Sequence, residues 1–389
     1  MMPSSTHSKH TPQNLSASLL RRVVIKLGTN TVIDSQNEFN AARLEPLVSS
    51  IATFKHQQQR QIVLVSSGAV GMGAARLGIS KARLHDVVMR QACAAVGQSL
   101  LMQSYGQLFR AHKIKTAQLL VTEPDFAGLQ RHANLRHTIE KLLKLNVLPI
   151  INENDATSTA EIEYLDKSHR VFSDNDLLAG LVTSKLEADA LILLTNVDGL
   201  LFRTENGEEL ISTVMSITPE LRQLARGPSP NGRGGMLTKL KAAEIAMRTG
   251  ALAIIANGTR PDTLSRIFAG ESVGTRFIPG ACLNGKRRWI TYIAGVQGRL
   301  VVDDGARDAI LARKASLLIS GVTRLEKPFN TRDVVSIVDS TGREFARGIT
   351  NCSSREAHSL MKKRASKSGK QSYSKKGKVL VTRNNIVIL

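Results

Sequence analysis

Short apolar runs alternate with longer amphipathic stretches between residues 21 and 279. The apolar runs are rich in Val, Ile and Leu: Val23–Ile25, Ile62–Val65, Thr116–Val121, Val147–Ile151, Ala190–Leu194 and Leu252–Ala256. The stretches between them repeat apolar residues at helical spacing: Arg43–His56, Val87–His112, His132–Leu145, Asp176–Leu186 and Thr238–Arg248. Strands that alternate with helices predict a layered α/β/α domain around a mainly parallel sheet.

The pattern changes after about residue 281, where short β segments take over. They are Arg299–Val302, Val334–Val338, Phe345–Ile349 and Val379–Thr382, with one helix at Asp304–Arg313 and a hairpin-type turn at Asp339–Gly342. This order predicts a second, small, mostly-β domain. We therefore expect a disordered tail at 1–19, an α/β domain at 20–281, a linker at 282–296 and the β domain at 297–389.

Three segments allow more specific expectations. Residues 200–230 are polar and punctuated by Gly and Pro, which is typical of a partly ordered flap. Residues 362–378 carry eight basic and no acidic residues, which indicates a mobile loop before the last strand. The helix at 87–112 has an apolar face that we expect to pack into the core: Val88, Ala92, Ala95, Leu100, Leu101 and Leu108.

Charge is unevenly distributed along the 389 residues. The chain has a formal net charge of +21, and residues 281–389 contribute 22 Lys and Arg against 8 Asp and Glu. Such a basic C-terminal part suggests RNA or another polyanion as a partner, although a merely solvated basic surface explains the composition equally well. No apolar run approaches the roughly 20 residues that span a bilayer, and the three cysteines are far apart. We expect a cytoplasmic protein without membrane association.

The stretch from Asn231 to Lys239 joins a glycine-rich turn to the start of a helix. Glycines let the backbone approach an anion closely, and a helix start offers unpaired N–H groups and a positive dipole end. The stretch is not a Walker A loop, because it lacks the Gly-Lys-Ser/Thr ending. It predicts a phosphate site if other segments supply partners, and a plain helix cap otherwise.

Three other polar segments follow apolar runs directly. Lys26–Asn30 follows the first run, Ser66–Ala69 the second and Asn152–Asp155 the fourth. Because parallel strands present their carboxyl ends at one edge of a sheet, where open α/β sheets bind ligands, we expect these segments to form one site.

Two lysines are suited to phosphoryl transfer, which needs positive charge at the moving group more than covalent help. Lys26 and Lys239 could approach the phosphates of ATP from opposite sides. Two converging cations repel each other, so a carboxylate between them is expected, and Asp174–Asp176 at a helix start offers one. The same residues could simply cap that helix.

Together these segments resemble the amino-acid kinase superfamily in order and spacing. The resemblance rests on Val24–Thr29, Val65–Ala69, Asn152–Asp155, Ser173–Asp176, Leu194–Leu200 and Gly232–Met236. The C-terminal part, with Lys286–Trp289 and Gly298–Ala306, resembles the PUA domain that many members carry. Within the superfamily, the chain is most similar to members that phosphorylate the γ-carboxylate of L-glutamate, the first step of proline biosynthesis.

The resemblance implies roles for individual residues. Lys26, Asp176 and Lys239 would be catalytic, with Asp176 orienting the two lysines. Glutamate would bind to Ser67, Gly68, Ala69, Asp155 and Asn175. ATP would bind to Lys26, Thr195, Asn196, Arg233, Gly234, Gly235, Met236, Leu237, Thr238 and Lys239.

The resemblance also implies ATP with Mg²⁺, without a dedicated protein metal site, feedback inhibition by proline, and a homo-oligomer that is a tetramer or dimer. Arg233 stands where Thr is common, and Asn196 stands where Asp is common, so these two positions depart from the pattern. The alternatives are another amino-acid kinase, acting on acetylglutamate or aspartate, and an RNA-binding protein that uses its PUA domain.

Overall fold

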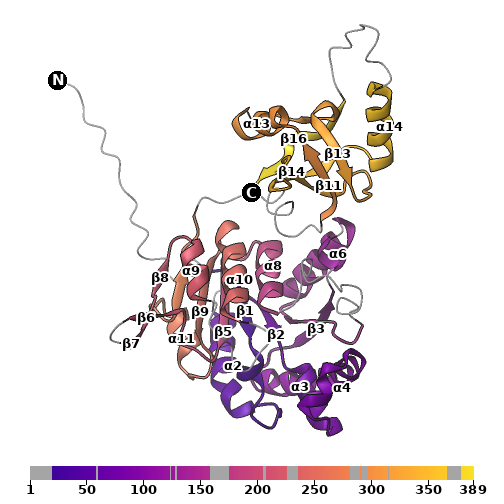
Figure 1. Ribbon diagram of the computed structural model, residues 1–389. Helices are drawn as coiled ribbons and strands as arrows, with labels where there is room; N and C mark the ends of the chain where they lie inside the picture. Colours follow the sequence, from indigo (N-terminus) through magenta and orange to yellow (C-terminus); the bar gives the residue numbers. More distant parts are fainter. Residues whose placement is uncertain are drawn as a thin grey trace, which may run out of the picture.

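Two units, each built on its own sheet, make up the protein (Figure 1). The computed structural model describes residues 20–57, 60–122, 124–127, 129–157, 175–204, 207–225, 235–280, 290, 296–313, 315–365 and 378–389. The predicted tail at 1–19, most of the predicted linker at 282–296, and residues 231–234 of the glycine turn lie outside these residues. Val296, the last residue of the predicted linker, already begins a strand.

The first unit contains an eight-stranded sheet in the order β3-β4-β2-β1-β5-β9-β10-β8. The first six strands in this order are parallel to their neighbours. Their bounds match the six apolar runs of the sequence: β1 Arg22–Leu27, β2 Gln61–Ser66, β3 Thr116–Val121, β4 Leu148–Glu153, β5 Ala190–Thr195 and β9 Leu252–Asn257. At one end, β10 (Thr275–Phe277) runs antiparallel to β9, and β8 (Thr213–Val214) pairs with β10.

Helices cover both faces of this sheet, because alternate strand residues point to opposite sides. Val24 and Leu191 face the core shared with α8 (Asn175–Leu186) and α10 (Met236–Arg248). Ile25 and Ile192 face the core shared with helices on the other side: α2 Ala41–His56, α4 Val87–Ala111 and α11 Thr263–Phe268. Figure 1 shows α6 (Leu129–Lys144) on the same side as α8 and α10. The predicted α/β/α fold with a mainly parallel sheet is confirmed.

The segment at 200–230 is more regular than the sequence analysis predicts. It contains the hairpin of β6 (Leu201–Thr204) and β7 (Gly207–Leu210), then β8, then α9 (Pro219–Leu224). The apparent chain breakers are turn and cap residues instead: Gly207 has a φ of 123°, and Pro219 begins α9 behind the capping hydroxyl of Thr218. Residues 226–230 lie outside the described part.

Helix α3 (Ala69–Leu77) and α4 pack with their backbones in contact. A Cβ atom on Gly97 would lie 1.8 Å from the carbonyl oxygen of Ala69, and one on Gly73 would lie 1.8 Å from that of Cys93. Only glycine fits at these two positions. The contact fixes the start of α3, at Ala69, relative to α4.

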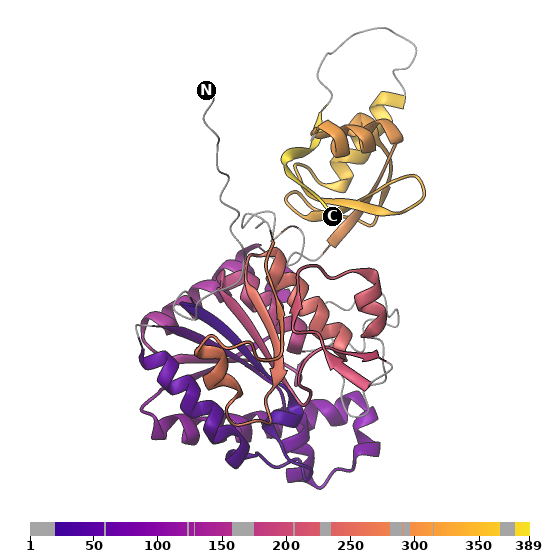
Figure 2. The same ribbon diagram turned by 90° about the vertical axis from the view of Figure 1, so that its left-hand side faces the viewer.

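The second unit is a six-stranded sheet in the order β12-β16-β15-β14-β11-β13 (Figure 2). Its strands are β11 Val296–Val302, β12 Leu317–Leu318, β13 Val322–Glu326, β14 Val334–Val338, β15 Glu344–Thr350 and β16 Val379–Ile388. Helix α13 (Asp304–Arg313) has the predicted bounds, and Gly342, with a φ of 85°, turns the chain between β14 and β15. The small, mostly-β domain is confirmed.

One prediction about this unit was wrong. Residues 362–365, expected in a loop, continue α14 (Ser354–Ala365). Lys and Arg are good helix formers, so a basic run does not by itself end a helix. Residues 366–377 lie outside the described part. Among the residues that the structure does describe, no helix is long and apolar enough to cross a membrane.

Candidate active site

The carboxyl ends of the central parallel strands meet at one edge of the first sheet. Leu27 at the end of β1 pairs with Ser66 at the end of β2 and with Leu194 near the end of β5. Helix α8 begins at Asn175 and α10 begins at Met236. Ion pairs and hydrogen bonds bring both helix starts together with the ends of β1 and β2.

Lys26 and Lys239 bind the same carboxylate. The Nζ atom of Lys26 lies 2.6 Å from Oδ1 of Asp176, and the Nζ atom of Lys239 lies 2.9 Å from Oδ2. All three residues are buried, and Asp176 is 0% exposed. The structure thus brings together the three residues that the sequence analysis predicted to be catalytic.

Two ammonium groups face the single carboxylate of Asp176, so positive charge is concentrated at this edge of the sheet. Burial alone would raise the pKa of Asp176, but attraction and hydrogen bonds from Lys26 and Lys239 outweigh it and hold the pKa below its usual range. Asp176 is therefore ionised at neutral pH. Clustered ammonium groups attract anions, so this pair of lysines suits an anionic ligand.

Glycines flank this cluster on two segments. A Cβ atom on Gly28 would lie 3.3 Å from the carbonyl oxygen of Leu194, a tight contact, and 3.6 Å from the Nζ atom of Lys26, an ordinary one. Gly235 caps α10 without a side-chain hydrogen bond. The Thr238 hydroxyl lies 2.8 Å from the carbonyl oxygen of Gly235 and 3.3 Å from Oδ2 of Asp176. The start of α10 thus lies beside the lysine pair, as a phosphate site requires.

A second group of polar residues lies beside Asp176. The Asn175 side chain donates to the carbonyl oxygen of Ser66 at 3.0 Å and to the Ser67 hydroxyl at 2.9 Å. Gly68, with a φ of 113°, makes the turn from β2 into α3, which starts at Ala69. The left-handed conformation favours glycine at this position. Ser67, Gly68, Ala69 and Asn175 therefore form a wall that adjoins Asp176, the partner of the two lysines.

The remaining predicted residues are placed less completely. Asp155 lies in the turn that follows β4. Thr195 ends β5 and its hydroxyl donates to the Asn196 side chain at 3.3 Å. Gly235, Met236 and Leu237 form the start of α10. Arg233 and Gly234 lie outside the described residues.

Sequence reasoning missed a layer of buried polar side chains behind this wall. Asn152 donates to Gln98 of α4 at 2.9 Å, and the hydroxyl groups of Ser66 and Tyr105 lie 2.8 Å apart. Burial raises the pKa of Tyr105, which therefore stays neutral. A signal was present: Gln98 stands in line with Ala94, Leu101 and Tyr105 on α4, and a polar residue on a buried face needs a partner.

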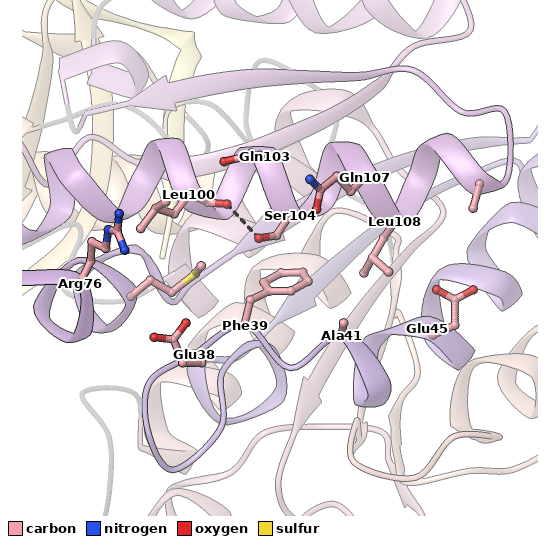
Figure 3. Close-up of a pocket in the computed structure, with 12 residues that line it drawn as sticks. Glu38, Phe39, Ala41, Glu45, Arg76, Leu100, Gln103, Ser104, Gln107 and Leu108 are labelled. Carbon is pink, nitrogen blue, oxygen red and sulfur yellow. Dashed lines mark hydrogen bonds between the residues drawn. The ribbon is translucent and has the colours of Figure 1, made fainter.

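A separate cavity of about 480 Å³ lies between the chain that precedes α2 and the helices α3 and α4 (Figure 3). Phe39, Met72 and Leu108 line it together with Glu38 and Gln107. None of the residues that the sequence analysis assigned to ATP or glutamate lines this cavity.

Comparison with known proteins agrees with this fold. The chain belongs to the amino acid kinase family, whose family model matches residues 21–257, and a PUA domain model matches residues 298–370. Curated relatives are named glutamate 5-kinase. Those from Myxococcus xanthus and Laribacter hongkongensis are 43% and 41% identical to this chain. The alignments cover 85% of this chain and 86% of the first relative, and 93% of each chain for the second. A third, from Pelobacter propionicus, is 37% identical over 95% of this chain and 98% of its own length. The resemblance stated from the sequence is confirmed.

Proposed function

We propose that the protein is a glutamate 5-kinase, which transfers the γ-phosphoryl group of ATP to the γ-carboxylate of L-glutamate, the first step of proline biosynthesis. The observation that carries the proposal is the pair of buried lysines, Lys26 and Lys239, held on the single carboxylate of Asp176. Lys239 lies in the first turn of α10, whose start suits phosphates, and Asp176 directly follows Asn175, which with Ser67 forms the wall that suits an amino acid.

The chemistry needs few reactive groups from the protein. The γ-carboxylate of glutamate, whose pKa in water is about 4.3, is ionised at neutral pH and attacks without a general base. One of its oxygens forms a bond to the γ-phosphorus, while the bond from that phosphorus to the bridging oxygen breaks and ADP leaves. Lys26 and Lys239 stabilise the charge on the transferring group, and Asp176 keeps their ammonium groups in place.

Magnesium is part of the proposal as a companion of the nucleotide. Both oxygens of Asp176 already face lysines, and the described residues contain no group of three His, Cys, Asp or Glu side chains suited to hold a metal ion. This donor set fits a magnesium ion held through phosphate oxygens and water. When bound, the ion would neutralise phosphate charge.

Thr195, Asn196 and residues 233–239 line the nucleotide in this proposal, and Ser67, Gly68, Ala69, Asp155 and Asn175 hold glutamate. The assignments of Asp155, Thr195, Asn196, Arg233 and Gly234 rest on the family resemblance alone. A rise in KM for glutamate alone on Asp155→Asn would support its assignment. A rise in KM for ATP alone on Thr195→Ala would do the same for the nucleotide side.

Further expectations about partners also stay proposals. Proline would inhibit by competing with glutamate, which kinetics with varied glutamate tests. A homo-oligomer, tetramer or dimer, would show in light scattering. The basic second unit would bind RNA, which a salt-dependent mobility shift tests. A cytoplasmic location fits the buried free thiols Cys93 and Cys352, and cell fractionation tests it.

The experiment that tests the proposal is a substrate panel. We expect purified protein with ATP and Mg²⁺ to form an acyl phosphate, trapped as a hydroxamate, with L-glutamate far faster than with aspartate or N-acetylglutamate. Turnover of aspartate or N-acetylglutamate instead would assign the protein to another branch of the family. RNA binding without turnover of any acid would favour the PUA domain as the functional part.

A further inference from the structure

A chain of buried amides links α4 to the proposed glutamate site. The Asn152 side chain donates through Nδ2 to Oε1 of Gln98 at 2.9 Å. Its Oδ1 atom accepts from Nδ2 of Asn175 at 3.0 Å. Gln98 and Asn152 are 8% and 2% exposed, so the bond between these two side chains is shielded from water.

Two backbone groups determine which way the side-chain amides of Asn152 and Asn175 are oriented. Oδ1 of Asn152 also accepts from the backbone N–H of Glu153 at 2.9 Å, which can only donate. The amide nitrogen of Asn152 must therefore face Gln98. Nδ2 of Asn175 also donates to the carbonyl oxygen of Ser66 at 3.0 Å, which can only accept. The oxygen of Asn175 must therefore point the other way.

That oxygen, Oδ1 of Asn175, is buried and has no hydrogen-bond partner among the described residues. A buried carbonyl oxygen without a donor is unfavourable, so a ligand that supplies a donor would be favoured there. Asn175 directly precedes Asp176, the residue that holds the lysine pair. An amino-acid substrate brings a suitable donor, its α-ammonium group.

We propose that Gln98 is a positioning residue for the ammonium group of the substrate. Gln98 holds Asn152, and Asn152 holds the Asn175 amide with its oxygen toward the ammonium group. This inference rests on the proposed function. It adds the residue on α4 that makes the site prefer an α-amino acid to a dicarboxylate without an amino group.

The test compares variants that differ only in the acceptor at position 98. Gln98→Met and Gln98→Leu remove the acceptor, whereas Gln98→Glu keeps an acceptor oxygen. We expect the first two to raise KM for L-glutamate about tenfold, with kcat and KM for ATP little changed, and Gln98→Glu to retain most of the affinity. Two variants without the acceptor keep the test independent of whether one of them folds.

Glutarate, which is glutamate without its ammonium group, separates loss of ammonium binding from general damage to the site. Its binding, measured as KM or as an inhibition constant, should be the same in the unchanged protein and in Gln98→Met, so the preference for glutamate over glutarate falls about tenfold. Gln107→Leu is the matched control, because Gln107 is exposed on the same helix and lines the separate cavity (Figure 3).

Equal loss for glutamate and glutarate would overturn the inference, as would identical behaviour of Gln98→Met and Gln98→Glu. Unchanged KM for glutamate in both variants without the acceptor would do the same. A failure of the unchanged protein to phosphorylate glutamate would instead refute the proposed function, so the two failures are distinguishable.

Discussion

At the scale of single residues, Lys185 couples the stability of the fold to pH. It lies at the end of α8, only 1% exposed, and its Nζ atom has no hydrogen-bond partner among the described residues. The ammonium group lies 4.7 Å from the ring centre of Phe126 in α5 (Pro124–Ala127). Burial lowers the pKa of Lys185 to about 7, outweighing the opposing attraction of Asp125.

The lowered pKa makes the sign of the pH effect definite. Between about 7 and its ordinary value, the unfolded chain holds the Lys185 proton and the native state does not, so stability rises with pH over this range. We expect Lys185→Met to melt several degrees above the unchanged protein at pH 6.5, and the gap to narrow by pH 9.5. Lys241→Met, at an exposed position of α10, serves as the control. Melting curves that differ by the same amount at every pH would contradict this.

Some residues of the candidate site were predictable from local sequence pattern, and others were not because they depend on contacts between distant segments. Lys26 follows an apolar run and Lys239 follows a glycine turn, so local pattern was enough to single out both lysines, which the structure brings together on Asp176. The partnership of Gln98 with Asn152 joins residues 54 positions apart, and local pattern carries no such information. Hydrogen bonds between distant amides become visible only once the fold has placed them.

At the scale of elements, the contact between α3 and α4 connects stability to the proposed glutamate site. Because Gly97 lets the backbone of α4 touch Ala69, any side chain at position 97 must push α3 away. The start of α3 carries Gly68 and Ala69, which belong to the proposed substrate wall. Movement of α3 would therefore weaken glutamate binding as well as the fold.

We expect Gly97→Ala to lower the melting temperature and to raise KM for glutamate more than KM for ATP. The matched control is Gly106→Ala on the same helix, where an added Cβ atom meets no atom within 4 Å. Alanine is the better helix former by roughly 0.5–1 kcal/mol, so this control should be neutral or stabilising. If the two variants melted and bound glutamate alike, the backbone contact would not matter as described.

The predicted apolar face of α4 is right at Leu100, Leu101 and Leu108, which pack in or against the core, and wrong in its first half. Val88 is 65% exposed, and Ala92 and Ala95 are exposed too. The buried face instead carries a mixed set: Arg90, Cys93, Ala94, Gly97, Gln98, Leu101, Tyr105 and Phe109. Hydrophobic patterning fails in the first half of α4 because Gly97 and Gln98 serve close backbone packing and a hydrogen bond, whereas Leu101, Tyr105 and Phe109 join the apolar core. The six parallel strands, which do serve an apolar core, were predictable.

At the scale of the whole molecule, one buried cluster joins the two units. Ile290, Val334 and Val387 belong to the same cluster as the core between the first sheet and the helices α8 and α10. The sequence predicted two domains from a change of strand and helix pattern. The sequence did not indicate that the two domains pack together. A few isolated apolar residues have the same sequence pattern whether their side chains face solvent or a neighbouring domain.

The proposed function also depends on the whole molecule, because it requires residues from β1, α8 and α10 to act on one transferring phosphoryl group. The most direct measurement is the steady-state turnover of Lys26→Ala, Lys239→Ala and the double variant, with exposed Lys241→Ala as the control and circular dichroism to verify folding. Each single change should lower kcat by about 10² to 10³ fold, and the double change should cost less than the product of the two, since both lysines act on one group. A loss of only a few-fold in either folded single variant would contradict the account.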